Sequence, residues 1–189
     1  MLKRLLAVSL LLLMVSPAAA AELGPDGLHK TEWMRQTFNN LREDLAEARA
    51  EGKRFAIIFE QRGCIYCEKM HEEVFPDPKI SEYIKENFFF VQYNLFGDLP
   101  VTDFDGTEGT EKQMARRWGI HFTPTIMFFP EDDPGEVPAD EAAVVTMPGA
   151  FGKGTTYNML TWIVEKGYES GETFQRYHAR KLQEQQAAN

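Results

Sequence analysis

Hydrophobic positions follow two different spacings, and the spacing changes several times along the chain. Apolar residues recur every three or four positions over residues 31–50, which predicts an amphipathic helix that stops before Gly52. Short apolar runs over residues 55–59 and 88–93 are instead bounded by polar residues, which predicts strands. The apolar positions of the expected helix are Trp33, Met34, Phe38, Leu41, Leu45 and Ala48.

The rest of the chain continues in the same way, and its order of elements predicts an α/β fold. We expect a mixed central sheet flanked by helices, with an N-terminal helix, an acidic loop insert and a C-terminal helical extension. Further helices are expected over 64–75, 79–87, 110–118, 155–166 and 172–186, further strands over 125–129 and 142–147, and loops over 22–30, 95–110 and 130–141.

The N-terminal segment has the pattern of a cleavable export signal. Lys3 and Arg4 precede an apolar run over residues 5–15, and small residues follow. The run is shorter than the roughly 20 residues that cross a bilayer, so we expect no stable membrane insertion after cleavage. We therefore predict a signal peptide over 1–21, a domain over 22–168, a C-terminal helical extension over 169–189, and a periplasmic location.

Composition narrows the class of protein. The chain has 189 residues and a formal net charge of −9, which argues against a nucleic-acid partner because such a partner selects a basic face. Two cysteines are too few for a disulfide-rich scaffold or for a zinc site of four cysteines. In an oxidising compartment, two thiols are expected to pair or to do redox work.

Both cysteines stand in one motif, Cys64-Ile-Tyr-Cys67, between an expected buried strand and an expected helix. The free N–H groups and the dipole of a helix N-terminus favour a thiolate at the first cysteine. The second cysteine lies close enough to close a small disulfide ring. Cys64 could then attack a disulfide, and Cys67 could release the mixed disulfide. We therefore predict Cys64 and Cys67 to be a redox-active disulfide.

Other uses of the two cysteines remain open. A structural disulfide would constrain the unfolded chain little, because its loop is so short. Covalent haem attachment is excluded, because it needs a histidine directly after the second cysteine, where Glu68 stands. Cys64, Cys67 and His71 could instead supply three ligands to copper or zinc, although the sequence shows no fourth ligand. No glycine-rich phosphate loop is present, so we expect no organic cofactor.

With these residues in place, the chain resembles the secreted thioredoxin-like proteins over about residues 50–168. The resemblance rests on the strand-CxxC-helix unit, on Thr123-Pro124-Thr125 before a strand, and on Gly149-Ala150 after the last strand. It implies a cis-proline at Pro124 opposite the dithiol, with the backbone of Thr123 pairing with the bound substrate chain. It also implies that Gly149 lies beside the substrate groove.

The chain departs from that family at its buried acid, whose position is taken by Ile58. Glu60 lies two residues later and shares a strand face with Ile58, so it could take the proton of Cys67. The alternative is a strand-end carboxylate in water.

The phrase Phe-Glu-Gln-x-Gly-Cys-x-Tyr-Cys, with Met-Pro-Gly-Ala and the helical C-terminus, is similar to the SoxW-type thioredoxins of bacterial sulfur-oxidation systems. That resemblance implies a periplasmic dithiol protein that serves thiol redox in a sulfur-oxidation pathway. We expect it to reduce disulfides of exported clients and, outside the cytosol, to take its electrons from a membrane thiol-electron transporter. The expected direction follows from Ile65 and Tyr66, which add no positive charge between the cysteines. The alternatives are a dithiol oxidase or isomerase, and a metal or thiol carrier without turnover.

Overall fold

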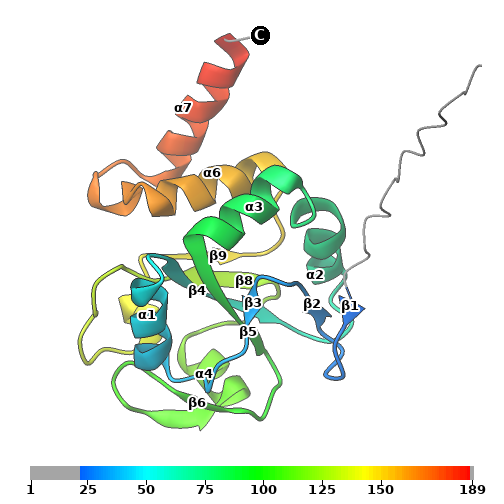
Figure 1. Cartoon of the computed structure of the whole chain (residues 1–189), viewed down its shortest axis with the longest axis vertical. Coiled ribbons are helices and arrows are strands. Elements are labelled where there is room, and N and C mark those ends of the chain that lie inside the picture. Colours follow the sequence, from blue (N-terminus) through cyan, green and yellow to red (C-terminus); the bar gives the residue numbers. More distant parts are fainter. Residues whose placement is uncertain (1–21, 188–189) are drawn as a thin grey trace, which may run out of the picture.

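A five-stranded mixed sheet forms the centre of the protein. The computed structural model describes residues 22–187. The strand order is β3 (Met34–Arg35), β5 (Phe88–Asn94), β4 (Arg54–Glu60), β8 (Thr125–Phe128) and β9 (Val145–Pro148). The first three strands are parallel to one another, and β8 and β9 each run antiparallel to the strand before them in that order. The expected α/β fold with a mixed sheet is confirmed (Figure 1).

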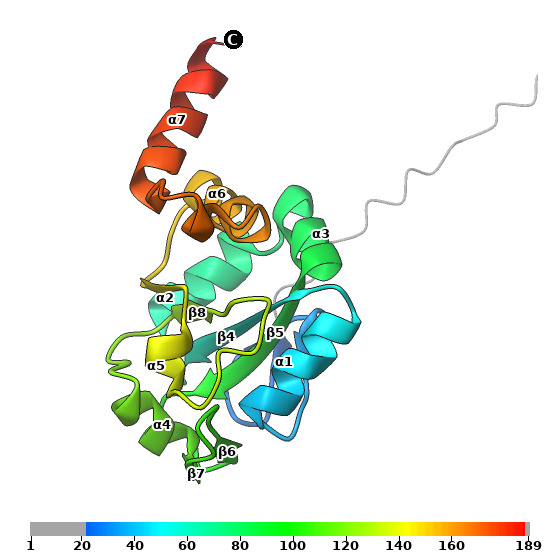
Figure 2. The same ribbon diagram turned by 90° about the vertical axis from the view of Figure 1, so that its left-hand side faces the viewer.

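Helices cover both faces of the sheet, as Figures 1 and 2 show. One face packs against α1 (Leu41–Ala50) and α4 (Glu111–Arg117). The other packs against a helical segment after the dithiol, against α3 (Pro78–Asn87) and against α6 (Lys153–Val164). The smaller elements are β1 (Glu22–Leu23), β2 (His29–Lys30), β6 (Pro100–Thr102), β7 (Glu108–Thr110), α5 (Ala139–Ala142) and a 3₁₀ turn (Gly167–Glu169).

Strand β4 shows how the sequence supplies both layers. Successive side chains of a strand point to opposite faces. Phe55, Ile57 and Phe59 accordingly join the core under α1 and α4. Ala56 and Ile58 join the core on the other face. All of these side chains are fully buried, so the run is apolar throughout rather than alternating.

The helix expected over 31–50 was wrong in its first half. The segment before Asn40 contains β3, which pairs in parallel with β5, and Phe38 is 93% exposed rather than on a buried helix face. The helix begins only at Leu41, because the side chain of Asn40 accepts hydrogen bonds from the first backbone N–H groups. Trp33 and Met34 are buried as expected, but Met34 lies in β3 and Trp33 directly precedes that strand.

The helix expected over 64–75 changes its winding midway. Helix α2 (Ile65–Lys69) is regular, and Met70–Val74 continues as a π-helix. Such wide turns are rare and often lie at functional sites. The stop near Pro76 was correct, and α3 follows with Asp77 as its cap.

All three segments expected to be loops contain structure, and residues 22–30 hold the antiparallel pair β1 and β2. Within residues 95–110, β6 and β7 form a small hairpin, and Asp103 and Phe104 are fully buried. Asp103 accepts hydrogen bonds from Trp118 Nε1 and from the backbone of Ala139. The segment is therefore only partly an acidic surface loop. Residues 130–141 likewise lead into α5, whose alanines are buried, and the following strand begins at Val145 rather than at residue 142.

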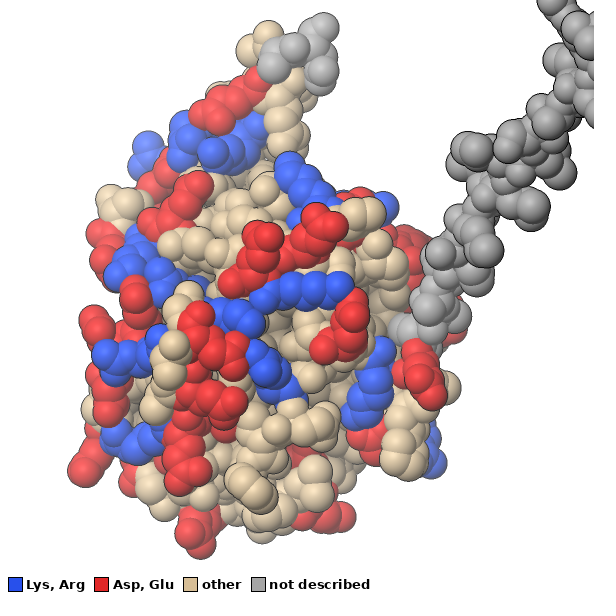
Figure 3. All heavy atoms as spheres, in the orientation of Figure 1, with Lys and Arg blue, Asp and Glu red and all other residues tan. Residues whose placement is uncertain are grey.

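The last helix, α7 (Phe174–Ala187), extends away from the sheet beyond α6 (Figure 1). Its apolar stripe packs largely onto its own domain: Tyr177 is buried and bonds to Glu165, and Phe174 contacts Trp162. Leu182 remains 42% exposed. Figure 3 shows acidic and basic side chains interspersed on one side of the molecule, including this helix.

The described part of the chain has no helix that is both long and apolar enough to span a bilayer. The predicted signal peptide, residues 1–21, lies outside the described residues.

Candidate active site

The two cysteines form a disulfide at the N-terminus of α2. Cys64 is the N-cap residue, and its sulfur accepts a hydrogen bond from the backbone N–H of Cys67 at 3.0 Å. The two Cα atoms are 5.2 Å apart. Cys64 is 7% exposed and Cys67 is fully buried. A disulfide partner can therefore approach only Cys64, which suits Cys64 as the attacking sulfur and Cys67 as the resolving one.

The three residues expected at the substrate groove are Thr123, Pro124 and Gly149. Thr123 contacts Cys64, and Gly149 contacts Pro124. The peptide bond between Thr123 and Pro124 is cis, as expected. The Thr123 hydroxyl donates a hydrogen bond to the sulfur of Cys64 at 3.2 Å. The backbone N–H of Gly149 donates to the Pro124 carbonyl at 2.7 Å, and its φ of 96° suits glycine. The substrate-binding roles of these residues stay predictions.

Apolar side chains stand exposed next to these residues. Ile65 and Tyr66, which follow Cys64, are 68% and 58% exposed, and Phe122, which precedes Thr123, is 69% exposed. Exposed apolar groups gathered around a reactive group are typical of a binding surface. This surface offers an apolar contact for a polypeptide that reaches Cys64.

Glu60 is fully buried at the end of β4. Its Oε1 lies 2.8 Å from Nε2 of His71, and its Oε2 accepts a hydrogen bond from Nε2 of Gln92 at 2.7 Å. The alternative of a strand-end carboxylate in water is therefore wrong. The π-turn that carries His71 and the core around Ile58 lie on the same side of the sheet, so the expected sharing of a face by Ile58 and Glu60 is confirmed.

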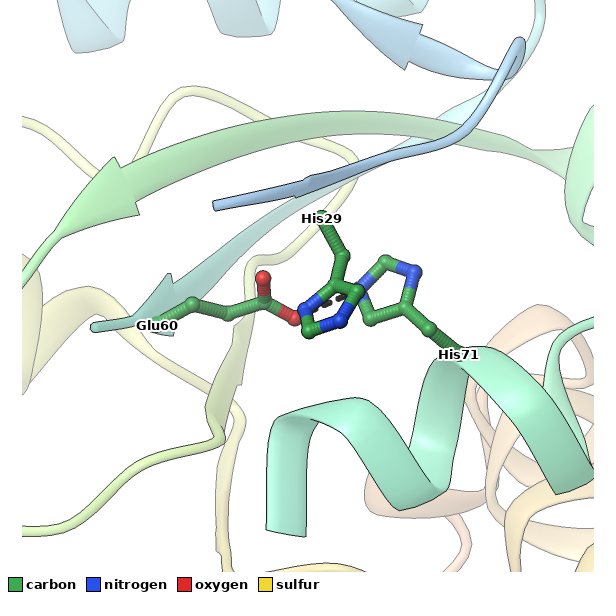
Figure 4. A group of neighbouring side chains, drawn as sticks. All are labelled: His29, Glu60 and His71. Atoms are coloured by element: carbon green, nitrogen blue, oxygen red, sulfur yellow. Dashed lines mark hydrogen bonds and ion pairs between the residues drawn. The ribbon is translucent and has the colours of Figure 1, made fainter. Parts of the chain in front are cut away.

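His71 faces the carboxylate and a second histidine. Its ring stacks on that of His29, with centroids 4.9 Å apart and planes 20° apart (Figure 4). Within residues 22–187, the metal-ligating atoms that converge within 4.8 Å of one another belong to His29, Glu60 and His71. His71 is thus gathered with His29 and Glu60 rather than with Cys64 and Cys67, which form a disulfide.

The sequence reasoning missed His29 and Gln92. His29 lay in a segment expected to be an irregular lead-in, so nothing there pointed to the site. Gln92 did carry a signal, because it is a single polar residue inside the aromatic run of β5. It lies opposite Ile58 in the parallel register and so beside Glu60.

The basic side chains nearest the dithiol in sequence are engaged elsewhere. Arg62 donates to the backbone carbonyl of Asp26 at 3.3 Å, and Lys69 lies 4.0 Å from the carboxylate of Glu73. The helix N-terminus, the Cys67 N–H and the Thr123 hydroxyl are thus the groups shown to favour negative charge on Cys64.

This fold, with a disulfide between two cysteines three positions apart at a helix start, defines a protein of the CxxC redox class. The thioredoxin-like domain family matches residues 41–144, which is more than half of the chain. The chain belongs to this thioredoxin-like domain family.

Two solved structures show the same fold. A thioredoxin-fold protein from Helicobacter pylori is 19% identical with a TM-score of 0.53, over 70% of this chain and 86% of that one. A thioredoxin from Thermus thermophilus is 24% identical with a TM-score of 0.53, over 69% of this chain and 88% of that one. No curated protein matches the sequence.

Proposed function

We propose that this protein is a periplasmic thiol-disulfide oxidoreductase that reduces disulfides of exported client proteins. The observation that carries the proposal is the position of Cys64. Its sulfur caps a helix, lies within 3.2 Å of the Thr123 hydroxyl, and is the less buried half of a disulfide with Cys67. A sulfur placed in this way is stabilised as a thiolate once the disulfide is reduced.

The reaction transfers two electrons from the protein dithiol to the client disulfide. The Cys64 thiolate attacks one client sulfur, the client S–S bond breaks, and the other client sulfur leaves as a thiolate. Cys67 then loses its proton and attacks the Cys64 sulfur. The intermolecular bond breaks, the client departs as a dithiol, and the Cys64–Cys67 disulfide forms.

Substrate binding is assigned to the surface around Cys64. The backbone of Thr123 pairs with the extended client chain, and Gly149 leaves room beside it. Main-chain pairing of this kind supplies affinity without demanding a client sequence. The exposed side chains of Ile65, Tyr66 and Phe122 supply apolar contact. These features support broad recognition of extended segments that carry a disulfide.

Glu60 is assigned as the acceptor of the Cys67 proton. It is buried on the sheet face that the helical segment after Cys67 covers. A buried carboxylate is an effective base when the donor lies in the same water-poor region. Substituting Glu60→Gln keeps the size and the hydrogen bond accepted from Gln92 but removes the base.

The matched control for this assignment is Glu68→Gln, which makes the same chemical change on an exposed carboxylate next to Cys67. We expect Glu60→Gln to slow disulfide exchange and to change its pH profile, and Glu68→Gln to leave the profile unchanged. An unchanged profile for Glu60→Gln would refute the assignment.

The proposed direction rests on the two residues between the cysteines. Ile65 and Tyr66 carry no charge that would stabilise the reduced thiolate beyond what the helix supplies. We place the reduction potential nearer to roughly −270 mV than to roughly −120 mV, the range from thioredoxin to the strongest oxidants. Equilibration with glutathione measures it, and a potential above about −180 mV would favour the dithiol oxidase or isomerase instead.

Electrons would come from a membrane thiol-electron transporter, and the pathway served would be sulfur oxidation. Both rest on the similarity to the SoxW-type thioredoxins and on the predicted signal peptide. Client capture tests them, because Cys67→Ser cannot resolve the mixed disulfide and so retains clients on Cys64. Exported proteins among the captured clients would support the proposal, and exclusively cytosolic clients would contradict it.

Reduction of insulin disulfides tests the activity itself. The fully reduced, metal-free protein should precipitate insulin faster than Cys64→Ser under the same conditions. Equal rates would overturn the reductase and favour a carrier without turnover.

A further inference from the structure

Three side chains from separate elements converge next to the proposed active site. His29 comes from β2, Glu60 from the end of β4, and His71 from the π-helix Met70–Val74. Each offers one ligand atom, and these atoms all lie within 4.8 Å of one another. Figure 4 shows the three side chains gathered together, with the Glu60 carboxylate directed at His71 and the His29 ring beside them. Glu60 and His71 are buried, and His29 is half-buried, so the point is shielded but reachable from the side of His29.

We propose that His29, Glu60 and His71 form a binding site for one divalent transition-metal cation, and that Zn²⁺ fits it best. Two imidazole nitrogens and one carboxylate oxygen are a donor set that zinc uses in sites with three protein ligands and one open position. Imidazole selects against Ca²⁺ and Mg²⁺, which prefer oxygen ligands. The negative charge of a buried carboxylate also favours a cation over a neutral occupant.

A second layer of hydrogen bonds holds two of these ligands in place. The side-chain amide of Gln92 donates to Oε2 of Glu60 and to the backbone carbonyl of His29, each at 2.7 Å. Lys30 in turn donates to Oε1 of Gln92 at 2.6 Å and is paired with Asp26. Outer hydrogen bonds of this kind orient the ligands of metal sites and strengthen binding. Gln92 leaves Oε1 of Glu60 to face the histidines.

A cation that binds His71 would displace few existing hydrogen bonds. Its Nε2 shares one hydrogen bond with Oε1 of Glu60, and among residues 22–187 its buried Nδ1 has no hydrogen-bond partner. A buried imidazole usually satisfies both nitrogens. The cation therefore replaces a single shared proton, and the ring can turn toward the cation without breaking any other hydrogen bond.

Metal binding here would act on the thiol chemistry. This consequence rests on the proposed function, because it takes Glu60 as the acceptor of the Cys67 proton. A cation that holds the Glu60 lone pair prevents that proton transfer. Bound Zn²⁺ would then slow resolution of the mixed disulfide and make the site an inhibitory one.

The binding test uses the full chain with its disulfide oxidised, so that no cysteine thiolate can bind the metal. Isothermal titration with Zn²⁺ alone should give one equivalent bound. His29→Asn and Glu60→Gln should each weaken binding by at least about tenfold. The matched control is His121→Asn, which removes an exposed imidazole outside the cluster and should bind as the unaltered protein does.

Absence of stoichiometric binding to the oxidised protein would overturn the site. Unchanged affinity in His29→Asn would overturn it as well. His29 is the variant least exposed to folding failure because it is only half-buried, and an unchanged melting temperature in circular dichroism verifies that its fold is kept.

The inhibitory role is tested separately by insulin reduction at fixed free Zn²⁺. Zinc also binds reduced dithiols directly, so the informative comparison is between the unaltered protein and His29→Asn. Weaker inhibition of His29→Asn supports the role, and equal inhibition overturns it. Binding with no reductase activity at all would instead reject the proposed function and leave the metal site standing.

Discussion

Asp44 is an acid buried where its charge is costly. It lies in the first turn of α1 with 3% of its surface exposed, and its Oδ2 accepts one hydrogen bond from the hydroxyl of Thr37 at 3.1 Å. Burial, opposed in part by the Thr37 hydrogen bond, raises the pKa of Asp44 from 3.8 to about 7. The folded protein therefore holds this proton more tightly than the unfolded chain does.

The size and the sign of the effect follow from linkage. The shift is about three pKa units, and one unit corresponds to about 1.4 kcal/mol, so the change in unfolding free energy is about 4 kcal/mol. Because the folded state binds more protons, the Asp44 contribution is present below pH 4. This contribution is lost progressively as the pH rises from about 4 to about 7. Above about pH 7, the titration of Asp44 changes the unfolding free energy no further.

Substituting Asp44→Asn removes this dependence, because an amide resembles the protonated acid and can still bond to Thr37. We expect urea unfolding at a series of pH values to give an advantage for Asp44→Asn that grows by about 4 kcal/mol between pH 4 and pH 8. The control is Ala46→Ser, at an exposed position of the same helix, which adds no titratable group and should therefore change stability equally at every pH. A pH-independent difference for Asp44→Asn would refute the reasoning from burial.

Two further predictions concern the active site and the insert. Thr123→Val removes the hydroxyl that donates to the sulfur of Cys64, so alkylation of reduced Cys64 by iodoacetamide at pH 7 should slow by up to about tenfold; an unchanged rate would contradict the hydrogen bond to the thiolate. Phe104→Ala should lower the unfolding free energy by about 3–5 kcal/mol in urea, because its fully buried ring packs on Phe129. Phe96→Ala, at a side chain 65% exposed in the same segment, should change it by less than about 0.5 kcal/mol, and equal costs would contradict a folded insert.

Strands were predicted better than helix boundaries. The run that became β4 is apolar from Phe55 to Phe59, and the run of β5 is interrupted only by Gln92; short runs of this kind, bounded by polar residues, are typical of strands buried in a sheet. The segment before Asn40 carries apolar residues at helical spacing, yet Trp33 is needed against Phe75 and Phe90 across the sheet face. Tertiary packing overrode the local pattern there.

The insert over residues 95–110 shows a second limit of prediction from sequence. Its acidic residues predicted a solvated loop, but Asp103 is buried because Trp118 and Ala139 both donate to it. Burial raises the pKa of Asp103, and the charged form is stabilised by those donors, by the backbone N–H of Phe104 and by Arg117. Composition cannot distinguish an acid in water from one that closes a buried network.

The candidate site also combines residues that the sequence locates with contacts that it does not predict. Cys64 and Cys67 could be located from the sequence, because their spacing and their place between a strand and a helix are local features. Thr123 entered through a family resemblance, and its contact with Cys64 spans 59 positions. Such contacts depend on how the sheet is ordered, which no local pattern records.

Local sequence patterns are enough to locate a CxxC dithiol at the start of a helix, within an α/β chain whose apolar runs form a buried sheet. The physical reason is that helix dipoles, strand burial and disulfide ring size all act over a few residues. The three-dimensional packing is what buries Glu60 against His71 and adds His29 and Gln92 to the cluster. Those partners meet because the parallel pairing of β4 and β5 places Gln92 beside Glu60. The π-helix Met70–Val74 and the strand β2 then bring His71 and His29 to the same place.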